Sequence, residues 1–112
     1  MDVVEFKKLQ KNFDDEYIGP YNKQPEDLLF LATALAGEVG EFANIVKIYY
    51  RLEKKRVGVS SDKDRDYFTD MKKEITDVFV YFLIIANLLD LDIEKSYLDN
   101  LERNKKRFTK IK

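Results

Sequence analysis

The chain has 112 residues, a formal net charge of −1, and neither cysteine nor histidine. These absences exclude disulfides, thiol chemistry, Ser-His nucleophiles, imidazole acid–base catalysis and the Glu-x-x-His ligand pairs of di-iron bundles. Chemistry must therefore come from carboxylates, lysine, tyrosine or a bound hard cation. With 37% charged residues, 4 Gly and 2 Pro, the composition favours helices in a single domain over residues 1–112.

The first half of the chain predicts two helices. The spacing of Val3, Phe6, Leu9, Gln10 and Phe13 predicts a helix over residues 2–14. A connector, DDEYIGPYNKQ, follows, with Gly-Pro as its turn signal. A proline suits the first helical position, so the second helix is predicted over residues 25–51. Its expected apolar stripe consists of Leu28, Leu31, Leu35, Val39, Phe42, Val46 and Tyr49.

The second half predicts two more helices after a polar loop over residues 53–63. The third helix is expected from Asp64 to Leu89, and Asp92 is a suitable N-cap for a fourth helix over residues 93–108. The thin apolar face of that fourth helix is Ile93, Tyr97, Leu101 and Phe108. The predicted fold is therefore all-α, a four-helix, bundle-type arrangement.

The third helix is apolar on nearly every side between Val78 and Ile85. Such a helix must be covered all round, so we expect oligomerisation to complete the fold, as a homodimer or homotetramer. The longest apolar run, VFVYFLIIANLL at 78–89, is too short to span a bilayer, and the opening MDVVEFKK is not a signal peptide. No membrane partner is therefore expected, and since the lack of cysteine leaves the compartment unrestricted, a cytoplasmic location is the default expectation.

Two pairs of acidic residues lie inside the most apolar helices: Glu38 and Glu41 in EVGEF, and Glu74 and Asp77 in EITD. Residues three apart point to the same side of a helix. If the two helices pack antiparallel through these faces, four carboxylates converge in a half-buried site. Their repulsion and loss of hydration would favour a bound Mg²⁺ or Mn²⁺. The alternative is that each pair is a solvated helix edge.

The C-terminal stretch LERNKKRFTKIK carries a net charge of +5, which leaves −6 for the rest of the chain. Asn100, Asn104 and Arg107 form a row on the fourth predicted helix that is suited to holding a phosphate chain. The alternative is a basic helix end stabilised only by the helix dipole. Nucleic acid is not the expected partner, because the stretch lacks interleaved aromatic platforms.

Two stretches, QPEDLLFLATALAGEVGEF at 24–42 and EITDVFVYFLIIANLLDLDIEKSYLDNLERNKKRF at 74–108, resemble the MazG-like nucleotide pyrophosphohydrolases of the all-α NTP pyrophosphatase superfamily. The resemblance rests on the E-x-x-E…E-x-x-D pairs, the Asp-containing turn before the last helix and the closing N-x-x-R-F. It covers about residues 20–108. It implies Mg²⁺-dependent hydrolysis of a nucleoside triphosphate to the monophosphate and pyrophosphate.

By position, the resemblance also implies roles for individual residues. The metal ligands would be Glu38, Glu41, Glu74 and Asp77, and Glu41 would also orient or deprotonate the attacking water. A further set would contact the substrate: Asn104 and Arg107 at the phosphates, with Asn100 in the same row, and Tyr81 at the pocket wall.

One more substrate contact is expected before the second helix. Many dCTP-preferring relatives carry an aromatic-His pair just before the Gln-Pro, where this chain has Asn22 and Lys23. Lys23 is therefore counted among the substrate-binding residues. The alternative to an enzyme is a non-catalytic helical module with the same fold, which binds a nucleotide or a protein partner.

Overall fold

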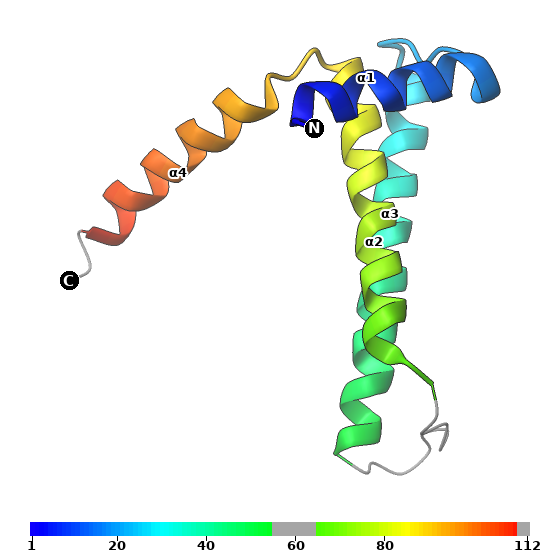
Figure 1. The fold of residues 1–112 in the computed structure, drawn as a ribbon, viewed down its shortest axis with the longest axis vertical. Helices are drawn as coiled ribbons and strands as arrows, with labels where there is room; N and C mark the ends of the chain where they lie inside the picture. The colour runs from blue at the N-terminus through cyan, green and yellow to red at the C-terminus, as the bar shows by residue number, and fades with distance from the viewer. Residues whose placement is uncertain (55–64, 110–112) are drawn as a thin grey trace. The chain divides into compact units, whose positions relative to one another are not determined.

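The computed structural model describes residues 1–54 and 65–109. In chain order these form α1 (Val3–Phe13), a π-helical turn η1 (Asp14–Ile18), α2 (Pro25–Glu53), α3 (Tyr67–Leu88) and α4 (Ile93–Thr109) (Figure 1). Four α-helices and no strand among these residues confirm the all-α prediction. The chain divides into two compact units, Pro25–Phe82 and Met1–Gln24 with Leu83–Lys112.

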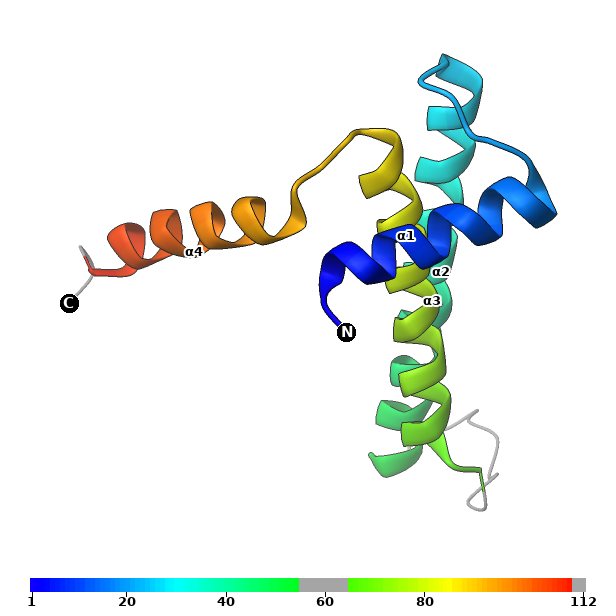
Figure 2. The ribbon, with the colours of Figure 1, turned by 45° about the horizontal axis from the view of Figure 1, so that its top comes forward.

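The unit Pro25–Phe82 is a helical hairpin. In both views α2 and α3 run side by side in opposite directions (Figures 1 and 2). Aromatic rings join the end of α2 to the start of α3: the Tyr49 ring centroid lies 6.0 Å from that of Tyr67 and 5.1 Å from that of Phe68. Tyr67 and Ile45 are buried. These contacts fix the axial register of the two helices, and thereby which side chains of α2 face α3.

The predicted apolar stripe of α2 was wrong in part. Leu28, Val39 and Val46 are 37%, 47% and 37% exposed, whereas Leu31 and Ile45 are buried. Because α2 is apolar on several sides, helical periodicity alone does not select the face that is covered. Contact with other helices selects it.

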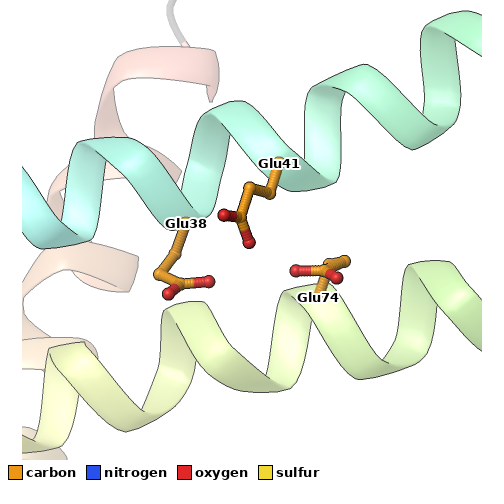
Figure 3. A group of neighbouring side chains, drawn as sticks. All are labelled: Glu38, Glu41 and Glu74. Atoms are coloured by element: carbon orange, nitrogen blue, oxygen red, sulfur yellow. The ribbon is translucent and has the colours of Figure 1, made fainter.

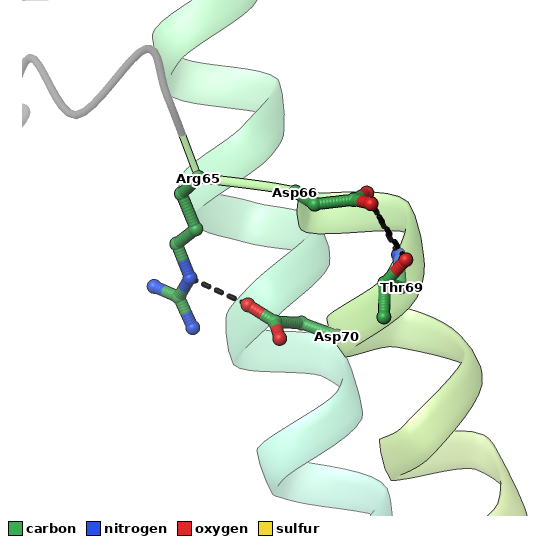
Figure 4. Close-up of polar contacts among 4 residues, drawn as sticks. All are labelled: Arg65, Asp66, Thr69 and Asp70. Atoms are coloured by element: carbon green, nitrogen blue, oxygen red, sulfur yellow. Dashed lines mark hydrogen bonds and ion pairs between the residues drawn. The ribbon is translucent and has the colours of Figure 1, made fainter.

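The start of α3 is fixed by two acidic side chains (Figure 4). Asp66 accepts hydrogen bonds from the Thr69 backbone N–H at 3.0 Å and the Thr69 hydroxyl at 2.6 Å, which hold the pKa of this carboxyl below its usual value. The Arg65 Nε donates to Asp70 at 2.6 Å. An N-cap at Asp66 explains why the helix begins at Tyr67 rather than at the predicted Asp64, which lies outside the described residues. The predicted polar loop also lies largely outside them.

In the other unit, α1 packs on the end of α3 through two polar contacts. The Asn87 side-chain amide donates to the Lys7 carbonyl at 2.9 Å, and the Lys7 ammonium donates to the Leu91 carbonyl at 2.6 Å. The helix α3 ends with a 6→1 hydrogen bond from the Leu91 N–H to the Ala86 carbonyl at 2.8 Å, and Asp90 adopts a φ of 53°. The left-handed conformation of Asp90 ends α3 at Leu88, one residue before the predicted end at Leu89.

The predicted connector after residue 14 was also wrong at its start. The chain stays helical through η1, in which the Gly19 N–H donates to the Asp14 carbonyl at 2.7 Å. Gly19 then adopts a φ of 104°, which glycine tolerates, and so ends the helix. The Asp14 side chain is 5% exposed and accepts a hydrogen bond from the Gln10 amide at 2.9 Å.

Asp92 is the N-cap of α4, as predicted, because its carboxylate accepts a hydrogen bond from the Lys95 backbone N–H at 3.0 Å.

Among the described helices, α2 alone is long and apolar enough to cross a membrane by length and composition, with a mean hydropathy of 1.4 over 18 residues. The same helix carries Glu38 and Glu41. The absence of a membrane partner therefore stays a prediction.

Candidate metal centre

Three carboxylates converge between the two helices of the hairpin (Figure 3). Glu38 and Glu41 lie on α2 and Glu74 lies on α3. One oxygen of each side chain lies within 4.8 Å of one oxygen of each of the others. The i, i+3 spacing places the first two on one side of α2, and the antiparallel packing brings the third opposite them. The structure therefore brings together three of the four predicted ligands.

The three glutamates differ in their access to solvent. Glu38 and Glu74 are half-buried, and the Oε2 atom of each is buried without a hydrogen-bond partner among the described residues. Glu41 is exposed. A buried oxygen without a partner is rare in folded proteins, because it loses its hydration and gains nothing in return. Two such atoms in one cluster indicate that a ligand belongs there.

The electrostatics of the cluster also favour a bound ligand. Burial raises the pKa of the Glu74 carboxyl above its usual value, and the nearby Glu41 carboxyl raises it further by hydrogen bonding and by charge. The charge of Asp77 adds to this rise, and the charge of Lys73 opposes it. Among the described ion pairs, none involves the three glutamates. Negative charge therefore accumulates here, and only the nearby charge of Lys73, which forms no described ion pair with the three glutamates, opposes the rise of the Glu74 pKa.

The donor set fits a hard divalent cation. All candidate ligand atoms are carboxylate oxygens, which Mg²⁺ and Mn²⁺ prefer, and the chain has no histidine or cysteine that would favour a softer metal. A cation at this point would give the two buried Oε2 atoms a partner and would relieve the repulsion that raises the pKa of Glu74.

The remaining predicted residues of the hairpin, Asp77 and Tyr81, lie further along α3. Asp77 is half-buried and is not part of the group of three, although its charge is felt by Glu74. Tyr81, one turn beyond Asp77, is also half-buried. Their roles as ligand and pocket wall stay predictions.

The predicted phosphate-binding row lies on α4, in the other unit. The Asn104 amide donates to the Asn100 side-chain oxygen at 2.9 Å, and both residues are exposed. Arg107 is exposed, and its guanidinium carbon lies 5.4 Å from the Phe108 ring centroid. The row is therefore present on one exposed side of the helix, and its contact with phosphate stays a prediction.

Lys23 has a partner that the sequence did not indicate. Its ammonium lies 2.9 Å from the Asp90 carboxylate, and both side chains are exposed. The two residues are 67 positions apart, so no local pattern reveals the pair. An exposed pair of this kind is weak enough for Lys23 to exchange partners, and its role toward substrate stays a prediction.

Comparison with known families adds the deciding observation. The family model of the MazG nucleotide pyrophosphohydrolase domain matches residues 27–111, which is most of the chain. The chain belongs to the MazG nucleotide pyrophosphohydrolase family. This confirms the resemblance that the acidic pairs and the N-x-x-R-F stretch indicated.

The MazG match contains all four predicted metal ligands and the row on α4, and it begins after α1 and η1. No curated protein and no solved structure matched the chain. The MazG family places the chain among nucleotide pyrophosphohydrolases.

Proposed function

We propose that this chain is a Mg²⁺-dependent nucleoside triphosphate pyrophosphohydrolase, which converts a (d)NTP to the (d)NMP and pyrophosphate. One observation carries the proposal: Glu38 and Glu74 both belong to the carboxylate cluster, and the Oε2 of each is buried without a hydrogen-bond partner among the described residues. In a family of nucleotide pyrophosphohydrolases, such a cluster is the natural site for the cation that accompanies a polyphosphate substrate. Control of the nucleotide pool or removal of unwanted nucleotides would be the cellular role.

The role of each hairpin residue would depend on how exposed its side chain is. Glu38 and Glu74, half-buried, would hold the cation, with Asp77 as a further ligand. Glu41 is exposed, so it can contact water, and it would orient the attacking water and accept its proton. When bound, Mg²⁺ or Mn²⁺ would neutralise the charge that develops on the phosphate oxygens.

The reaction is a single displacement at phosphorus. The oxygen of water forms a bond to the α-phosphorus, and the bond from that phosphorus to the oxygen that bridges it to the β-phosphorus breaks. Pyrophosphate leaves with the electron pair of that bond, and the proton of the water passes to Glu41. Asn104 and Arg107 would hold the phosphate chain, since a guanidinium can grip phosphate with two parallel hydrogen bonds. Asn100, Tyr81 and Lys23 would complete the substrate contacts.

The alternative function, a non-catalytic nucleotide- or protein-binding module, fits the carboxylate cluster less well. A scaffold gains stability when buried charges are replaced by apolar side chains, so it has no reason to keep two unpartnered oxygens at a helix interface. We further propose a homo-oligomer that covers part of α3, where Phe79 and Phe82 are 40% and 37% exposed, and a cytoplasmic location.

The test is product analysis with a panel of ribo- and deoxyribonucleoside triphosphates, with millimolar Mg²⁺ and with a chelator instead. We expect equal amounts of monophosphate and pyrophosphate, and only when the cation is present. Nucleotide binding without turnover for every member of the panel would favour the binding module.

A further inference from the structure

A cavity of about 510 Å³ lies between α1 and the turn that joins α3 to α4. All of its lining residues belong to one compact unit, Met1–Gln24 with Leu83–Lys112, in which α1 contacts α4 (Figure 1). Its volume is in the range of small-molecule sites. The match to the MazG family begins at residue 27, after α1, so the family match does not account for this cavity.

Two hydrogen bonds hold the lining of the cavity in place. The Asn87 side-chain amide donates to the Lys7 carbonyl at 2.9 Å, and the Lys7 ammonium donates to the Leu91 carbonyl at 2.6 Å. Both bonds join α1 to the end of α3, so the cavity exists before any ligand enters it. Apolar side chains form another part of the lining: Val3, Val4, Leu91 and Ile93.

Most charged side chains around the cavity already have a partner. Lys7 bonds the Leu91 carbonyl, Lys11 pairs with Asp15, Asp90 pairs with Lys23, and Asp92 caps α4.

Two charged lining residues differ from these. Lys8 and Glu94 form no hydrogen bond or ion pair among the described residues. Lys8 comes from α1 and Glu94 from the first turn of α4. The cavity therefore offers one available cation and one available anion, on two different helices, beside apolar surface.

We propose that this cavity binds a small zwitterion with an apolar side chain, an amino acid or a dipeptide. The ligand's carboxylate accepts a hydrogen bond from the Lys8 ammonium, its ammonium group donates to the Glu94 carboxylate, and its side chain packs on the valines of α1 and on Ile93. A simple anion would be repelled by the carboxylates of the α3–α4 turn, and a simple cation by the lysines of α1. The inference does not depend on the proposed function.

The experiment is a titration of the ¹⁵N-labelled protein, followed by amide chemical shifts. The probes are leucine and leucyl-leucine, each at up to millimolar concentration. We expect saturable shift changes at α1 and at the turn between α3 and α4. The tighter of the two probes identifies the source of the ligand, a free amino acid or a peptide.

Three analogues test the chemistry of the ligand. N-acetyl-leucine lacks the ammonium group, leucinamide lacks the carboxylate, and glycylglycine has both charges but no apolar side chain. Each is expected to bind about tenfold more weakly than the corresponding probe, because each loses one of the three contacts.

Exchange of the two charges tests the residues. Lys8→Glu should weaken leucyl-leucine binding by about tenfold or more. Addition of Glu94→Lys to that variant should restore most of the affinity, because the dipeptide carries the same side chain at both ends and can bind in reverse. Lys105→Glu makes the same charge change on α4 outside the cavity, so it should bind like the wild type.

Three results would overturn the inference. The first is the absence of saturable shifts at the cavity with both probes. The second is equal binding of N-acetyl-leucine or leucinamide, which would show that the ligand need not be a zwitterion. The third is equal binding by Lys8→Glu and Lys105→Glu, which would place the ligand elsewhere. Because Lys8 and Glu94 are exposed, their replacement should leave the fold intact, and the amide spectrum of each variant without ligand checks this.

Discussion

Glu38 on α2 and Glu74 on α3 direct carboxylate oxygens to within 4.8 Å of each other, and the Oε2 of each is buried without a hydrogen-bond partner among the described residues. The two helices are thus packed together through a pair of like charges. Their repulsion exists only in the folded state, because the unfolded chain separates them. A cation that binds here therefore acts on folding as well as on chemistry.

Addition of Mg²⁺ or Mn²⁺ is expected to raise the free energy of unfolding. The gain is about 2.7 kcal/mol when the free cation is at a hundred times its dissociation constant, because the unfolded chain has no assembled site. Urea denaturation with a chelator and with excess cation measures this gain directly. Identical unfolding midpoints under the two conditions would contradict a cation site at the cluster.

Glu74→Gln is expected to have opposite effects in the two conditions. Without cation the variant is more stable than the wild type, because one of the repelling charges is gone. With cation it loses most of the gain, because a ligand is missing. Glu53→Gln, at the exposed end of the same hairpin, is the matched control and should respond to cation like the wild type. Equal responses of Glu74→Gln and Glu53→Gln would place Glu74 outside the site.

Glu41→Gln is expected to lower turnover by about 10²–10⁴-fold, the range for loss of a general base. The amide keeps the size of the side chain, so the helical circular dichroism should not change. Steady-state pyrophosphate release under saturating cation is the measurement. Turnover close to that of the wild type would mean that Glu41 neither orients nor deprotonates the water.

Asp14 gives a prediction about pH. Burial raises the pKa of its carboxyl above the ordinary value, although the hydrogen bond from Gln10 works against this. The folded state therefore carries a cost at neutral pH, which shrinks as pH falls through the raised folded-state pKa and is gone below the pKa of the unfolded chain. Asp14→Asn should be more stable than the wild type at pH 7, and the difference should vanish below about pH 3.9.

The measurement is thermal unfolding of wild type and Asp14→Asn between pH 7 and pH 3. A variant that is less stable at pH 7, or a difference that does not change with pH, would show that Asp14 is well accommodated as a charged group.

Asp90 tests how α3 ends. Its φ of 53° suits glycine better than any residue with a Cβ, so Asp90→Gly should be more stable than Asp90→Ala by about 1 kcal/mol. Both variants lose the ion pair to Lys23, so the comparison isolates the backbone. Thermal unfolding of the two variants side by side gives the difference. Equal stabilities would mean that the left-handed turn is not populated in solution.

Much of the site was predictable because its causes are local. Acidic residues three apart lie on one side of any helix, and the isoleucine that follows them, Ile45, is buried as the packing of that side requires. The N-caps also follow from short-range chemistry: Asp92 fulfils the prediction, and Asp66 replaces the predicted start at Asp64 by the same rule.

Other features depend on contacts that no local pattern encodes. Val39 and Val46 are exposed although their spacing is that of a core stripe, because helix packing decides which apolar side of α2 is covered. The contact of Lys7 with Leu91 spans 84 positions. The π-helical turn η1 keeps the chain helical to Ile18, where the sequence predicted a connector, and Gly19 ends it with a φ of 104°.

The central claim is that the carboxylate cluster directs water to the α-phosphorus of a nucleoside triphosphate. The most direct measurement is hydrolysis in ¹⁸O-labelled water with Mg²⁺, followed by mass spectrometry of both products. We expect the label to enter the nucleoside monophosphate while pyrophosphate stays unlabelled, and we expect Glu41→Gln to slow the incorporation by the same factor as it slows turnover. Label in the pyrophosphate, or release of inorganic phosphate with a nucleoside diphosphate, would contradict it.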